Sequence, residues 1–139
     1  MVKEYDFRVA IHIHGPDIKT FPDATDVWNH VKDLDERIGI CYDITHTVRM
    51  GHNLVEDYMK YHKRVYDIHI KDVSRADKSG HTMEAGRGII NFKEFFNALI
   101  ETNYSGKCSI EHEKDMSDVF PGIAESIGYY RGALDVITQ

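Results

Sequence analysis

The residues best able to do chemistry in this chain are histidines and acids that sit inside short apolar stretches. His12, Asp43, His69 and Glu111 each lie in or beside such a stretch, and nine histidines is a high number for 139 residues. Taken alone, each would be interpreted as a hydrogen-bonded core residue. Together, two carboxylates beside two imidazoles are costly to desolvate unless a cation compensates them. Mixed nitrogen and oxygen donors suit Mn²⁺, Zn²⁺, Fe²⁺ or Co²⁺ better than Ca²⁺.

The stretches that carry these residues are predicted strands, each followed by a helix. In residues 8–14, Val9, Ile11 and Ile13 alternate with His12 and His14. Further strands are predicted at 38–43, 65–71 and 107–111, a long polar loop at 72–88, and helices at 23–34, 54–63, after an N-cap at Asn91 and from Pro121. Leu34, Ile100 and Leu134 are assigned to buried helix faces. This order predicts an α/β fold with parallel strands and outer helices.

The polar residues gather near the carboxyl end of each predicted strand, on the face opposite the apolar residues that meet the helices. That end is the catalytic face of an α/β barrel. Lys71 has the parity of His69 and could be a base, an anion contact or an ion-pair partner of Asp43 or Glu111. Cys41 shares the parity of Asp43, but lacks an activating arrangement and is interpreted as packing.

Composition excludes several classes of protein. The net charge is −6 and no basic stripe occurs, so nucleic acid is not an expected partner. The first ten residues lack the apolar region of a secretory signal, and no apolar run is long enough to span a bilayer, so no membrane contact is expected. Two cysteines in strand-like runs indicate a reducing compartment. We expect one cytoplasmic domain over residues 1–139.

Several ordered motifs carry a resemblance that covers nearly the whole chain. They are VAIHIHGP, IGICYDITHTVRMG, VYDIHIKDV, GRGIINF and SGKCSIEHEKD. In this order they resemble the xylose isomerase-like TIM-barrel superfamily, with the sugar phosphate isomerase/epimerase proteins as the nearest group. The resemblance implies a (β/α)4 half of a TIM barrel, equivalent to strands five to eight, and a divalent metal (Mn, Zn, Co, Fe or Mg) held from those strands.

The resemblance also assigns roles to single residues. It makes His12, Asp43, His69 and Glu111 the metal ligands, with Glu111 also the catalytic acid/base. His46 matches the substrate-side, catalytic His of a D-x-x-H motif. The resemblance also matches Arg75 to an Arg that holds substrate oxygens. From their positions, His14 is the reserve ligand and a substrate contact, and Lys71 is a catalytic candidate.

Two departures from the family pattern bear on function. Many members have Glu where this chain has His12, so the usual pair of opposed glutamates for proton transfer is incomplete. A TIM barrel also needs about 250 residues, and strands one to four are absent. We therefore expect association, either as a homo-oligomer (a dimer in the simplest case) or with a missing N-terminal half-barrel.

Three functions remain open at this point. The first is a metal-dependent isomerase or epimerase that removes a proton next to the carbonyl of a small sugar or polyol through an enediolate, and dehydration of a keto-polyol shares its first step. The second is a truncated or split half-barrel, inactive alone, that binds metal or needs a partner chain. Endonuclease IV-like repair is disfavoured, because residues 79–83 lack the expected Asp-x-His pair and the chain is acidic.

Overall fold

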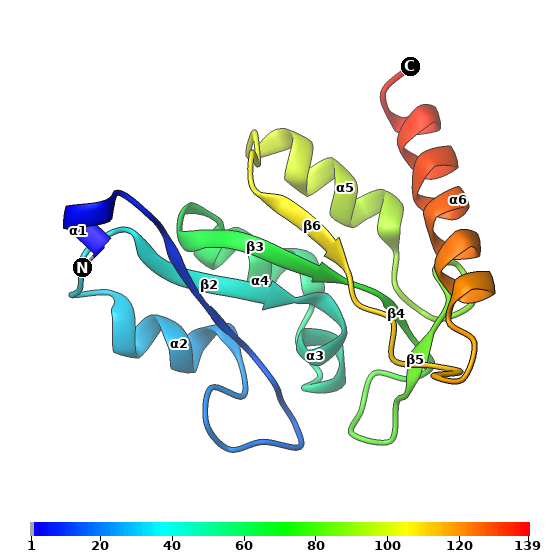
Figure 1. Cartoon of the computed structure of the whole chain (residues 1–139), viewed down its shortest axis with the longest axis horizontal. Coiled ribbons are helices and arrows are strands. Elements are labelled where there is room, and N and C mark those ends of the chain that lie inside the picture. Colours follow the sequence, from blue (N-terminus) through cyan, green and yellow to red (C-terminus); the bar gives the residue numbers. More distant parts are fainter. Residues whose placement is uncertain (1) are drawn as a thin grey trace.

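Four parallel strands form a twisted sheet in the computed structural model, which describes residues 2–139 (Figure 1). They lie side by side in chain order: β1 (Val9–His12), β2 (Ile38–Asp43), β3 (Val65–Ile70) and β6 (Lys107–Ile110). Met1, the first residue of the predicted domain, lies outside the described residues. Each neighbouring pair of strands is parallel, so the four carboxyl ends meet at one edge of the sheet.

Helices connect the strands and supply the core. They are α1 (Val2–Tyr5), α2 (Ala24–Val31), α3 (Ile44–Arg49), α4 (Leu54–Tyr61), the short 3₁₀ helix η1 (His62–Arg64), α5 (Phe92–Glu101) and α6 (Phe120–Ile137). The hydrophobic core lies between one face of the sheet and the helices packed on it. Its largest buried side chains include Tyr42, Tyr58, Phe92 and Phe95. The architecture is the predicted (β/α)4 half of a TIM barrel. Across residues 2–139, the helices are too short or too polar to cross a bilayer.

The predicted strands and helices are confirmed, but three buried positions were predicted wrongly. The helix predicted to reach Leu34 ends at Val31, because the Arg64 guanidinium binds the carbonyls of Val31 and Asp35, and Leu34 is 53% exposed. Ile100 lies in the last turn of α5, Leu134 of α6 lines a groove with Leu99 and Cys108, and both are exposed. Helix α3 was missed, because six residues are too few to show helical periodicity.

The loop predicted at 72–88 is more structured than its polarity indicates. It contains an antiparallel pair of two-residue strands, β4 (Asp72–Val73) and β5 (Thr82–Met83). The fully buried Asp72 carboxylate accepts the backbone N–H groups of four residues: Val73, Gly86, Gly88 and Ile90. A side chain at Gly88 would place its Cβ 2.3 Å from Asp72 Oδ1, so glycine is required there. Asp72 therefore fixes the path of the chain from β5 to α5.

Replacing Asp72 tests this role. Asp72→Ala leaves four N–H groups without their acceptor, so we expect a loss of about 3 kcal/mol in the free energy of unfolding. Urea unfolding followed by circular dichroism measures it. Asp33→Ala removes an exposed carboxylate and is the control. Equal stability of the two variants would show that Asp72 does not hold the loop.

Candidate metal centre

Four predicted ligands converge at the carboxyl edge of the sheet. One donor atom from each of His12, Asp43, His69 and Glu111 lies within 4.8 Å of the donors of the others. The register explains how four strands bring them together. His12 is opposite Cys41, Asp43 is opposite His69, and His69 is opposite Ser109, so the donors step two residues along the chain at two of the three strand boundaries. Such a stagger accompanies the tilt of strands in a barrel.

Asp43 is the most deeply buried member, with 0% of its surface exposed. Its Oδ1 caps α3 by accepting the backbone N–H of His46 at 2.8 Å. Its Oδ2 lies 2.9 Å from Lys71 Nζ and 3.4 Å from His12 Nε2. Burial alone would raise the pKa of Asp43, but the contacts with His12, Lys71 and His46 outweigh it and hold the pKa well below its usual value. Asp43 is therefore a permanent negative charge inside the site.

Lys71 supplies the compensating positive charge. Its Nζ forms ion pairs with Asp43 and Glu111, and with Glu113 at 2.8 Å, while only 2% of its side chain is exposed. Burial lowers the pKa of Lys71, but the three carboxylates raise it by more. The pKa of Lys71 is therefore above its usual value. Of the three roles left open for Lys71, the structure shows the contacts of the ion-pair role.

The imidazole rings line the other side of the centre. The rings of His12 and His69 lie 4.3 Å apart, those of His12 and His14 lie 4.0 Å apart, and that of His46 is 5.4 Å from His14. Burial lowers the pKa of His46, with the Asp43 charge opposing it. Nε2 of His12 and Nδ1 of His69 are buried and have no hydrogen-bond partner. Each of these nitrogens lies 3.4 Å from a carboxylate oxygen, of Asp43 and Glu111 respectively, without a hydrogen bond between them. A divalent cation would complete such a donor set, so the residues fit a metal.

Not every predicted residue reaches this cluster. Arg75 is exposed, and no hydrogen bond or ion pair within residues 2–139 joins its side chain to the ligands. His81 is also exposed and pairs with Ser74. Two residues beside the cluster were not predicted as site residues. Glu113 forms an ion pair with Lys71, and its position two residues after Glu111, on the same side of an extended chain, could have indicated it. Cys41 is the register partner of His12.

The sequence model of the xylose isomerase-like TIM barrel matches residues 1–136. The chain belongs to this family. One curated protein that is similar to this chain is the inosose dehydratase of Clostridium botulinum (strain Eklund 17B / Type B). That protein is 28% identical over 145 aligned residues, which cover 93% of this chain and 46% of the dehydratase. The chain spans about half the length of the curated relatives it matches.

Solved structures of the xylose isomerase-like fold superimpose on this family member over nearly its full length. A D-tagatose 3-epimerase-like protein covers 99% of the chain with half of its own length, at a TM-score of 0.81 and 22% identity. The IOLI protein, solved with a zinc atom bound, covers 99% of this chain with 51% of its own, at a TM-score of 0.74 and 20% identity. At these identities the likeness shows the fold, and it supports the half-barrel.

Replacing Lys71 tests the charge balance of the centre. Lys71→Met leaves the buried Asp43 carboxylate beside Glu111 and Glu113 without its cation, so we expect the metal-free protein to lose about 3 kcal/mol of stability. A divalent cation that binds the folded state should restore part of this loss. Thermal unfolding with and without EDTA measures both effects, and Lys78→Met is an exposed control. Unchanged stability of Lys71→Met in EDTA would contradict this charge balance.

Proposed function

We propose that this chain forms the metal-binding half of an isomerase- or epimerase-type enzyme that removes a proton next to the carbonyl of a small sugar or polyol. One observation carries the proposal: donor side chains from four parallel strands meet within 4.8 Å at the edge where α/β barrels do their chemistry. The dehydratase and epimerase names of similar proteins support the substrate class.

His12, Asp43, His69 and Glu111 would hold the cation. When bound, a divalent ion polarises a carbonyl oxygen and so acidifies the adjacent carbon. The zinc atom bound in the IOLI structure supports a cation in a protein of this fold, and the mixed donors admit Mn, Co, Fe or Mg as well. The buried nitrogens of His12 and His69, which lie beside carboxylates but make no hydrogen bond, are the feature of this chain that favours the assignment.

The remaining groups of the cluster are suited to moving a proton and holding oxygens. Glu111 has an ionic contact with Lys71 and lies 3.4 Å from His69, so its carboxylate is restrained while it accepts a proton from carbon. Lys71 and His46 are placed beside Asp43, where N–H donors can steady the negative charge that develops on a substrate oxygen. His14 lies next to His12 and His46 and can donate to a hydroxyl.

Dehydration is the second candidate reaction, because the curated relatives that match this chain are inosose dehydratases. Loss of water from a keto-polyol begins with the same removal of a proton next to the carbonyl. The two reactions differ in the next step, in which the dehydratase needs an acid beside the leaving hydroxyl. Arg75, predicted to hold substrate oxygens, is exposed on the loop and would reach a substrate only from outside the cluster.

Substituting one ligand tests the metal assignment. We expect His69→Ala to abolish Zn²⁺ and Mn²⁺ binding, because it removes one of only two nitrogen donors. His81→Ala should bind as the unchanged protein does, since His81 pairs only with Ser74 among the residues described. Isothermal titration into metal-free protein measures both. Equal binding by the two variants would place the ion elsewhere.

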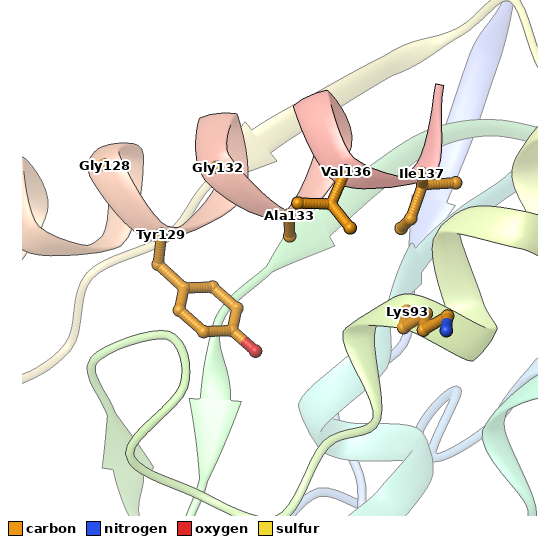
Figure 2. A pocket seen from close by; sticks show the side chains of 7 residues that line it. All are labelled: Lys93, Gly128, Tyr129, Gly132, Ala133, Val136 and Ile137. Carbon is orange, nitrogen blue, oxygen red and sulfur yellow. The ribbon is translucent and has the colours of Figure 1, made fainter. Parts of the chain in front are cut away.

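We further propose that another half-barrel completes the wall of the site. Within residues 2–139, β1 and β6 each pair with a strand on one side only. Helix α6 also exposes apolar surface. Val136 is 74% exposed and lines a groove of about 410 Å³ with Tyr129, Ala133, Ile137 and Lys93, where Gly128 and Gly132 leave the helix bare (Figure 2). In a closed barrel, both strand edges would be paired, and α6 would join the outer ring of helices.

The assembly prediction concerns this chain alone in solution. Sedimentation velocity over a range of micromolar concentrations should show a species heavier than one chain, because two half-barrels cover each other's edges as a dimer. A well-folded monomer at all concentrations would contradict self-association and leave a separate N-terminal half-barrel as the expected partner. Turnover of a ketose by such a monomer would refute the need for any partner.

A further inference from the structure

A second donor set overlaps the four ligands described above. One donor atom from each of His12, Cys41 and His69 lies within 4.8 Å of the other two. Cys41 is the register partner of His12 on the adjacent parallel strand, so the two side chains leave the sheet on the same face. His12 and His69 therefore belong to both sets, and Cys41 adds a sulfur donor two residues before Asp43.

The surroundings of Cys41 differ from those of a packing residue. Its side chain is 5% exposed, yet it is not part of the hydrophobic cluster, which lies on the helix-facing side of the sheet. Burial raises the pKa of its thiol, and the carboxylates of Asp67, Asp43 and Glu111, which belong to or adjoin the polar face, raise it more. A buried thiol within 4.8 Å of a donor nitrogen of each of two histidines is a soft donor set for a metal ion.

We infer that this centre has two ion positions that share His12 and His69: one completed by the carboxylates of Asp43 and Glu111, the other by the sulfur of Cys41. The inference rests on the metal centre proposed above. It assigns the sulfur position to thiophilic ions such as Zn²⁺, Co²⁺ and Cd²⁺, whereas Mn²⁺ and Mg²⁺ keep to the carboxylates. On binding at the sulfur position, Cys41 loses its S–H proton to solvent and its sulfur forms the bond to the ion.

In this arrangement, having His rather than Glu at position 12 affects which ions the centre binds. A Glu at that position would add a third charged oxygen donor beside Asp43 and Glu111 and favour hard ions, while His12 leaves a set of two nitrogens and one sulfur. The ion's identity then decides its position, and the position decides which acid is released for proton transfer. With the ion beside Cys41, Glu111 is no longer a ligand and remains free to act as a base.

Titration of the purified, metal-free chain with Co²⁺ and Cd²⁺ tests the sulfur position, because thiolate bound to either ion gives a charge-transfer band in the ultraviolet, at shorter wavelength for Cd²⁺ than for Co²⁺. The unchanged protein and Cys108→Ser should show this absorption, since Cys108 is exposed on β6. Cys41→Ser should lose it, and its Cd²⁺ affinity should fall at least about tenfold. Binding of Mn²⁺, followed by its electron spin resonance signal, should not change. Cys41→Ala, checked by circular dichroism, guards against misfolding of the Ser variant.

The outcomes separate the inference from the proposed function. Absorption that persists in Cys41→Ser, or its absence in unchanged protein that still binds Co²⁺, overturns the sulfur position and leaves the carboxylate centre intact. Binding of Cd²⁺ with the absorption, together with failure of Mn²⁺ to bind, supports the sulfur position and contradicts the carboxylate ligands. No binding of any of these ions refutes both.

Discussion

The arrangement of the site depends on one buried charge, the fully buried Asp43 carboxylate at the end of β2. Asp43 retains its charge only because Lys71, His12 and the N–H of His46 surround it. Each partner comes from a different element, so the sheet order and the start of α3 must be in place before the charge can be buried. The same charge makes the cluster attractive to a cation, since Lys71 already balances three carboxylates with a single positive charge.

The barrel geometry adds the other metal-binding donors to this buried charge pair. The stagger of the strands brings His12 and Glu111, at opposite edges of the sheet, to the same place as Asp43 and His69. A second carboxylate works differently: Asp72 binds only backbone N–H groups and shapes the loop that leads from β5 to α5. Two aspartates that are both fully buried thus have separate tasks, one in the chemistry of the site and one in holding the chain beside it.

The sequence contains enough to predict the strands, the helices and the four convergent donors. Alternation within each strand fixes which face a side chain takes, and parallel order brings the carboxyl ends together. Neither the alternation nor the strand order predicts side-chain contacts between different elements. Nothing near Leu34 in the sequence indicates that Arg64 will end α2, and the interpretation of Cys41 as packing could not include a register that places it opposite His12. Glu113 lies three residues beyond the end of β6, so its ion pair with Lys71 depends on the path of a loop that strand alternation does not predict.

Anomalous diffraction from crystals grown with Zn²⁺ tests the central claim most directly, because it locates the ion without reference to activity. We expect a single anomalous peak per chain within bonding distance of both His12 and His69, on the polar face of the sheet at the carboxyl ends of the strands. A peak at a site that excludes both histidines, or no peak in crystals soaked to saturation, would contradict a metal centre in this half-barrel.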